Sequence, residues 1–71
     1  MTKQEILRRM RDVEEELAGL WWELKKERKS TDDDDLFFVL ENAVPAAFEA
    51  DCILSSYCDD LEREIRHESV A

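Results

Sequence analysis

Apolar residues recur with one strict spacing along the first third of the chain. Successive members are separated alternately by four and three residues. This alternation is typical of a helix that buries one stripe of side chains against another helix. The stripe consists of Ile6, Met10, Val13, Leu17, Leu20 and Leu24. Thr2 followed by Glu5 forms a capping-box pattern just before it, so we predict a helix over residues 3–29.

The composition agrees with long helices packed into one small domain. The chain has 71 residues, of which 41% are charged and 44% hydrophobic, with one glycine and one proline. So few helix breakers, together with so much periodic apolar content, predict a folded all-α protein. Gly19 lies inside the first predicted helix, and we interpret it as a point where two helices approach closely rather than as a hinge.

An acidic turn follows over residues 30–35. Ser30 and Thr31 precede four consecutive aspartates, Asp32 to Asp35. Side chains of these types accept hydrogen bonds from the free N–H groups of a helix start, and their negative charge is favourable there. The alternative, a metal-binding loop, lacks the spaced ligands and the glycine of a calcium loop.

The second half of the chain predicts a helical arm that proline interrupts. The apolar run 36–40 is interpreted as a helix buried on more than one side, since a lone strand would have no partner. Pro45 either kinks a helix or starts a new one, for which Asn42 is a candidate cap. We therefore expect a short helix over 33–42 and a second over 43–67.

The spacing of four and three residues continues through the proline. The second stripe consists of Leu36, Leu40, Ala43, Ala47, Ala50, Leu54, Tyr57 and Leu61. If this arm folds back on the first helix, large residues face small ones, as in close-packed layers. The predicted pairs are Leu24 with Leu40, Leu17 with Ala47, Val13 with Ala50 and Met10 with Leu54. The predicted fold is an antiparallel helical hairpin with a kinked or broken second arm, two to three helices in all.

A hairpin of this kind leaves aromatic residues uncovered. Four of them fall near its loop end, namely Trp21, Trp22, Phe37 and Phe38. Clustered surface aromatics are typical of interface anchors, so we expect a second protein to cover them. Dimerisation into a four-helix bundle is the commonest solution. The alternative is a three-helix core in which the kinked segment buries these rings.

Charge divides the chain into two unlike parts. Residues 1–29 hold eight basic and seven acidic residues, whereas residues 30–71 hold two basic and twelve acidic ones, for a net charge of −9. A field of this sign repels nucleic acid and anionic membranes and favours a basic partner. We expect no direct binding of nucleic acid or membrane.

The sequence predicts a soluble, cytoplasmic protein. Its N-terminus enters a charged helical pattern at once rather than a secretion signal, and no apolar run reaches the roughly 20 residues of a membrane span. Cys52 and Cys58 are spaced so that one helix places them on different faces, too far apart for a disulfide. We interpret both as reduced, buried thiols.

Patterns that carry enzymatic chemistry are weak in this chain. His67 has no second histidine or cysteine at ligand spacing, and one glycine cannot build a phosphate-binding loop. Two carboxylate pairs, Asp12 with Glu15 and Asp59 with Glu62, have the spacing used by metal-dependent nucleotide hydrolases of helical bundles. The first pair points away from the apolar stripe, so we predict a protein without catalytic residues, metal or cofactor, and keep the hydrolase as a remote alternative.

The sequence is compatible with two alternative functions. In the first, the chain is an acidic interaction module that binds and inhibits a basic protein, with its carboxylates imitating a row of phosphates. Small size and strong acidity are shared with proteins that block host defences, such as anti-CRISPR proteins, although no motif indicates a named family. The candidate acidic contacts are Glu41, Glu49, Asp51, Asp59, Asp60, Glu62, Glu64 and Glu68. In the second, the chain is a structural module that assembles with itself.

Overall fold

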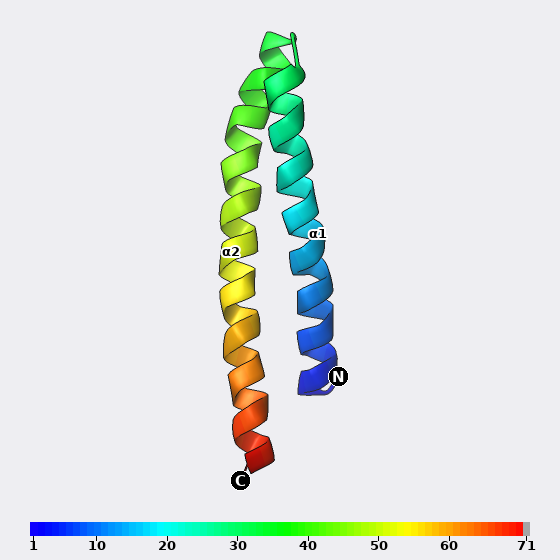
Figure 1. Cartoon of the computed structure of the whole chain (residues 1–71), viewed down its shortest axis with the longest axis vertical. Helices are drawn as coiled ribbons and strands as arrows, with labels where there is room; N and C mark the ends of the chain where they lie inside the picture. Colours follow the sequence, from blue (N-terminus) through cyan, green and yellow to red (C-terminus); the bar gives the residue numbers. More distant parts are fainter. Residues whose placement is uncertain (71) are drawn as a thin grey trace.

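The structure, a computed structural model, describes residues 1–70 and contains two helices. Helix α1 spans Lys3–Ser30 and helix α2 spans Asp34–Val70. They run antiparallel as a single hairpin, with both chain ends at the end opposite the loop (Figure 1). The molecule is a rod of 57 × 15 × 15 Å with a radius of gyration of 16.3 Å, against about 11 Å for a compact domain of this length. The all-α hairpin is confirmed.

The predicted cap at the start of α1 is present. Thr2 has extended backbone angles, and its hydroxyl oxygen accepts the backbone N–H of Glu5 at 3.1 Å. The hydroxyl also donates to the carboxylate of Glu5 at 3.1 Å. At the other end, the N–H of Thr31 donates to the carbonyl of Glu27, where the helix stops. Each end therefore satisfies part of its free backbone groups through neighbouring residues.

The aspartate run starts the second helix, as predicted. Asp33 is the capping residue, because its Oδ1 accepts the N–H groups of Asp35 at 3.0 Å and Leu36 at 3.1 Å. Its own N–H donates to the hydroxyl of Thr31 at 3.1 Å, which joins the ends of both helices. Asp34 and Asp35 lie in the first turn, where negative charge is favourable.

Proline does not divide the second arm. The short helix 33–42 and the separate helix 43–67 are replaced by one continuous helix, α2, that contains Pro45. Asn42 is not a cap, since it lies inside α2 and its side-chain amide donates to the carbonyl of Phe38 at 2.8 Å. Pro45 lies on the exposed side of α2, so the carbonyl that its missing N–H leaves free can be hydrated.

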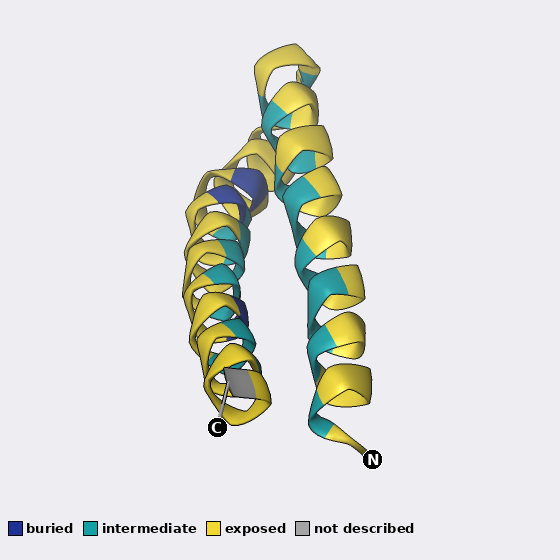
Figure 2. Cartoon of the chain, turned by 60° about the horizontal axis from the view of Figure 1, so that its bottom comes forward, coloured by how far each residue is buried: buried dark blue, intermediate teal, exposed yellow. Residues whose placement is uncertain are grey.

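Half of each predicted apolar stripe faces the partner helix in the structure. On α1 the facing positions, which we call the α1 seam, are Leu7, Met10, Glu14, Leu17, Trp21, Leu24 and Arg28. On α2 the corresponding α2 seam is Leu40, Val44, Ala47, Asp51, Leu54, Cys58, Leu61 and Ile65. Figure 2 shows these half-buried and buried positions as facing stripes. The predicted Ile6, Val13 and Leu20, together with Leu36, Ala50 and Tyr57, are exposed instead.

The register also differs from the prediction. Contacts join Arg11 to Asp59 and Glu62, and Trp21 to Asp51, several residues further along α2 than predicted. The connection explains the shift, because Thr31 is extended and Figure 1 shows the connection rising past the end of α1 before α2 begins. Extended chain advances about 3.3 Å per residue and helix only about 1.5 Å, so a few extended residues displace the register by roughly twice their number.

The described residues form a very small core. Only Leu40, Val44 and Cys58 are buried among them, and α1 contributes none. Cys52 is exposed, so the prediction of two buried thiols is wrong for it; neither cysteine is in a disulfide. Gly19 has no atom within 4 Å of the place where a side chain would begin, so it does not mark a close helix approach.

Candidate docking surface

Trp21 belongs to the packing between the helices rather than to the surface. Its ring meets Phe48 edge to face at 5.0 Å, and its indole N–H donates to Asp51 at 3.2 Å. Aromatic residues of this kind hold two helices together by apolar area and by one directed hydrogen bond. Trp21 is therefore half-buried, and it is less available to a partner than the sequence suggested.

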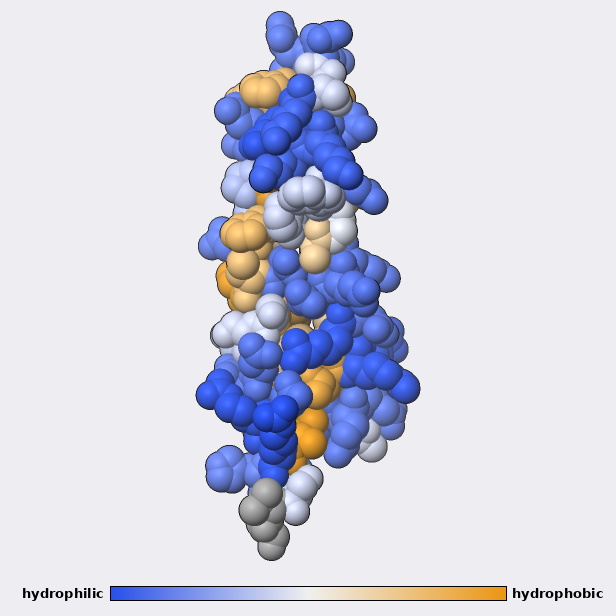
Figure 3. Space-filling view, in the orientation of Figure 1, coloured by the Kyte–Doolittle hydropathy of each residue, from blue (hydrophilic) through white to orange (hydrophobic). Residues whose placement is uncertain are grey.

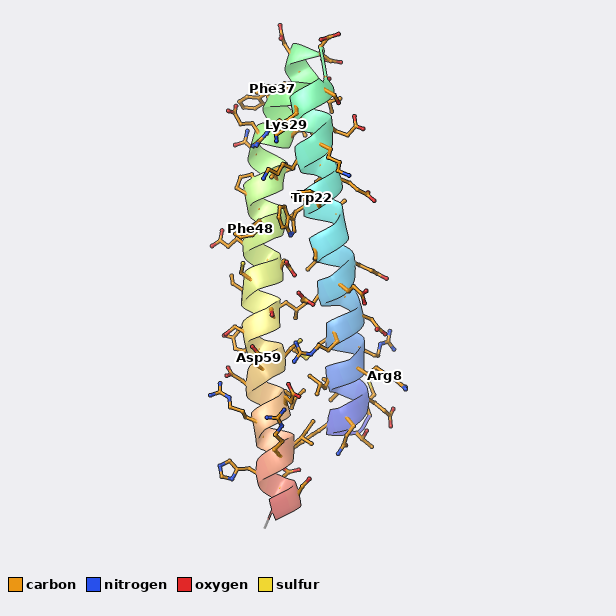
Figure 4. All side chains as sticks on the ribbon, viewed as in Figure 1. Arg8, Trp22, Lys29, Phe37, Phe48 and Asp59 are labelled. Carbon is orange, nitrogen blue, oxygen red and sulfur yellow. The ribbon has the colours of Figure 1, made fainter. Side chains whose placement is uncertain are left out.

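The other three predicted aromatics are exposed near the loop end. Phe38 is 68% exposed, and Trp22 and Phe37 are also exposed. Trp22 contacts the edge of Trp21 at 5.7 Å, and the ammonium groups of Lys25 and Lys26 lie 5.5 and 5.8 Å from its ring centre. Figure 4 shows Phe37 and Lys29 together at this end of the hairpin. A three-helix core is absent, so nothing in residues 1–70 covers Phe38.

Most of the predicted acidic contacts are engaged within the chain. Arg11 on α1 binds Asp59 at 3.1 Å and Glu62 at 3.0 Å on α2. Lys3 binds Glu64 at 3.1 Å and also contacts Glu68. The hydrogen bond to Asp59 raises the pKa of Arg11, and the bonds to Glu68 and Glu64 raise the pKa of Lys3. These contacts fasten the half of the hairpin that includes the chain ends.

The remaining acidic candidates divide between neighbours on α2 and solvent. Asp60 pairs with Arg63 one turn away, and Glu62 also binds Arg66 at 2.9 Å. Glu41 and Glu49 are exposed and take no part in the ion pairs formed within residues 1–70. The acidic arm is therefore a mixed, paired surface rather than an uninterrupted row of free carboxylates. Figure 3 shows one side of the rod covered mainly by hydrophilic side chains, with a hydrophobic strip between the helices.

Because the observed seams differ from the predicted stripes, a different set of apolar residues is exposed to solvent. Some apolar residues of the predicted stripes lie outside the observed seams, each one position before every second seam residue. Because α1 and α2 run antiparallel, these flanking positions lie on the same side of the hairpin. We call this side the uncharged face. It consists of Ile6, Val13 and Leu20 on α1 and Ala43, Ala50 and Tyr57 on α2. The opposite side carries the contacts of Arg11 with Glu62 and of Trp21 with Phe48.

The uncharged face is exposed at all of its positions except the half-buried Ala43, and a hollow adjoins it. Val13 is 48% exposed, Leu20 44% and Tyr57 63%. A hollow of about 310 Å³ lies at its α1 edge. The hollow is lined by Met1, Ile6, Arg9, Met10, Val13 and Leu54, almost wholly through apolar atoms. Exposed apolar residues gathered on one side of a small protein are typical of interaction surfaces.

Two acidic residues occupy facing places in the seams, which the apolar pattern did not indicate. They are Glu14 and Asp51, and both are half-buried. A hydrogen bond with Asp51, then burial, and then the charge of Asp51 raise the pKa of Glu14. One turn away, burial raises the pKa of the Cys58 thiol, which is 0% exposed. Glu14 is not apolar, so the spacing of apolar residues does not reveal its seam position.

Residues of the remote hydrolase alternative do not converge. Asp12 and Glu15 line a shallow polar hollow on α1, whereas Asp59 and Glu62 bind Arg11 from α2. Within residues 1–70, no three histidine, cysteine, aspartate or glutamate side chains are grouped so that they could hold a metal ion. Neither helix, as far as it is described, has a stretch apolar and long enough to cross a membrane.

Comparison with protein-family models, with curated proteins and with solved structures gives no match for this chain.

Proposed function

We propose that this chain is a protein–protein interaction module whose docking surface is the uncharged face, and that its partner there is a second copy of the chain. The single observation that supports this most is the run of uncharged positions on the same side of both helices, all of them exposed except the half-buried Ala43. A helix that is apolar over three of every seven positions is typical of a bundle with more than two helices.

The small core favours this proposal. With three buried residues in the described chain, the hairpin removes little apolar surface from water for its length. Packing the uncharged faces of two copies together would bury Val13, Leu20 and Tyr57 and complete a four-helix bundle.

Charge also favours a second copy at this face. Each chain has a net charge of −9, so two copies repel each other wherever their carboxylates meet. The uncharged face is where that repulsion is weakest. A basic partner would gain no ion pair there, because none of the six residues of the face is acidic.

The test is the solution mass by light scattering over a range of protein concentrations. We expect a dimer that persists at high salt, because apolar contacts are not screened. Val13→Glu should raise the dissociation constant by about tenfold or more, since it places a charge in the interface. Ser56→Glu adds the same charge at an exposed position outside the face, and it should leave the dimer intact.

Circular dichroism should show that both variants remain helical. A monomeric wild-type chain at high concentration would refute self-association. A dimer that Val13→Glu and Ser56→Glu leave equally stable would show that the copies meet through another surface.

A second candidate is docking of the loop end on a basic protein. Exposed Phe37 and Phe38 lie beside the acidic run 32–35 and the unpaired Glu41, a combination that suits a basic and partly apolar surface. Poly-lysine serves as a probe of this surface. Binding should weaken steeply with salt and with Phe38→Ser, and binding that neither change weakens would exclude this candidate.

A further inference from the structure

The seams contain one pair of acidic residues that the proposed docking does not use. Glu14 and Asp51 are the only carboxylates at seam positions, and they face each other from α1 and α2 near the middle of the hairpin. Two ionised carboxylates in such a place repel each other and are both partly removed from water. A hairpin with this arrangement would be destabilised unless something lies between the two groups.

Asp51 lacks a hydrogen-bond donor on the side-chain oxygen that Trp21 does not reach. Its Oδ2 accepts the indole N–H of Trp21 at 3.2 Å. Its Oδ1 is shielded from solvent and has no hydrogen-bond partner. Leaving a buried acceptor unpaired is costly, and the cost is larger for a charged group. A hydrogen bond with Asp51 is the largest cause that raises the pKa of Glu14, and the O–H of a protonated Glu14 would supply the donor that this oxygen lacks.

We propose that Glu14 and Asp51 hold one proton between them, and that the hairpin is stabilised when this proton is bound. The proton resides on Glu14, whose O–H donates to Oδ1 of Asp51. Asp51 then accepts from Trp21 through Oδ2 and from Glu14 through Oδ1. One proton thus removes the repulsion and satisfies the unpaired oxygen together.

The charges around Glu14 agree with this assignment. From α2, the bond with Asp51 and its negative charge raise the pKa of Glu14, and burial acts in the same direction. From α1, Glu15 raises this pKa further and Arg11 opposes the rise. The Cys58 thiol of α2 also lies near Glu14, and burial raises its pKa, so it stays neutral.

The direction of the pH dependence follows from the raised pKa. An ordinary glutamate has a pKa of 4.5, which is the value for the unfolded chain. Because the folded chain holds the proton more tightly, the stabilisation is fully present below that pH. It is lost as the pH rises through the higher pKa of Glu14 in the hairpin.

The experiment is urea unfolding at one fixed protein concentration, followed by circular dichroism from about pH 4 to about pH 8. A fixed concentration removes differences in the midpoint that arise from protein concentration, and Glu16→Gln shows how self-association responds to the loss of one charge. The variants are Glu14→Gln, whose amide can donate to Asp51 at every pH, and Asp51→Asn. Glu16→Gln is the matched control, because it removes the same charge from an exposed position on α1.

We expect the urea midpoint of Glu14→Gln to lie above that of the wild type at pH 8, with the difference closing as the pH falls. Asp51→Asn should make the urea midpoint less dependent on pH over the same range. This variant provides the test if Glu14→Gln folds poorly. Glu16→Gln should follow the wild-type profile.

A Glu14→Gln profile parallel to that of Glu16→Gln would overturn the proposal, and so would a lower midpoint at pH 8. A carboxyl NMR titration of the wild type gives a second readout. Glu14 should titrate above 4.5, and a midpoint at or below that value would likewise overturn it.

Discussion

The indole of Trp21 on α1 donates a hydrogen bond of 3.2 Å to the half-buried carboxylate of Asp51 on α2. It is the one directed side-chain contact between the helices in the half of the hairpin nearer the loop. Trp21→Phe keeps an aromatic ring but removes the donor, which leaves Oδ2 of Asp51 without its hydrogen-bond partner. We expect the free energy of unfolding to fall by about 1–3 kcal/mol in urea denaturation at neutral pH.

Trp22→Phe is the control for this change, because Trp22 is exposed and makes no hydrogen bond to α2 within the described chain. It should leave the free energy of unfolding nearly unchanged. Equal losses in the two variants would mean that ring size, rather than the bond to Asp51, determines the effect.

Val44 and Val39 give a matched test of the small core. Val44 is 7% exposed and Val39 is 58% exposed, although both belong to the same helix. Val44→Ala should reduce the free energy of unfolding by about 1–3 kcal/mol, through lost burial and the cavity left behind. Val39→Ala should leave it unchanged or raise it slightly, since alanine favours helix. Thermal unfolding of both variants measures the difference, and a larger loss for Val39→Ala would contradict the observed burial.

Pro45 weakens a helix that continues through it. Pro45→Ala restores the backbone N–H that would bond the carbonyl of Glu41, and it removes the ring from that turn. We expect higher helicity and a gain of about 1–3 kcal/mol in the free energy of unfolding. Pro45→Gly should give a smaller gain, because glycine restores the N–H without favouring helix. Loss of stability in Pro45→Ala would show that the hairpin depends on a bend at this residue.

The two cysteines should react at very different rates. Cys52 is exposed, whereas Cys58 is buried and its pKa is raised, so little of it is thiolate. In the folded protein a thiol reagent should modify one cysteine quickly, and Cys52→Ser should remove this fast phase. Both cysteines should react in urea. Fast modification of Cys58 in the folded Cys52→Ser variant would be inconsistent with the observed packing.

Gly19 gives a position where stability can be added. A side chain there would meet no atom within 4 Å, and its backbone is helical. Gly19→Ala should therefore raise the free energy of unfolding by about 1 kcal/mol or less, chiefly because alanine favours helix. Gly19→Ser is the comparison, with a smaller expected gain, and a decrease in Gly19→Ala would indicate a neighbour that covers this side of α1.

The class of fold was predictable because its signals are local. Few breakers, the caps at Thr2 and Asp33 and the heptad-like spacing each indicate helices, and one short polar segment between two periodic halves indicates a hairpin. Continuity through Pro45 was not predictable in this way. Packing along α1 holds the helix together across a residue that would end an isolated one.

The exact seam was harder to predict, for a physical reason. Met10, Leu17 and Leu24 belong to both the predicted and the observed stripe, but the residues between them can be read in two ways. Ile6, Val13 and Leu20 are apolar on one side, whereas Leu7, Glu14 and Trp21 on the other side include a carboxylate. The apolar pattern therefore favoured the stripe without a charge. The structure places Glu14 inside and leaves the more regular stripe to form the uncharged face.

The connection between the helices has a consequence for how the molecule can rearrange. Leu40, Ala47, Leu54 and Leu61 face α1 in the predicted and the observed packing alike, so a small rotation of each helix about its axis exchanges one stripe for the other while these four residues stay between the helices. The linked caps of Thr31 and Asp33 hold one of these two rotational states. A change in the length of this three-residue connection would shift the preference between them, and with it the side of the rod that is offered to a partner.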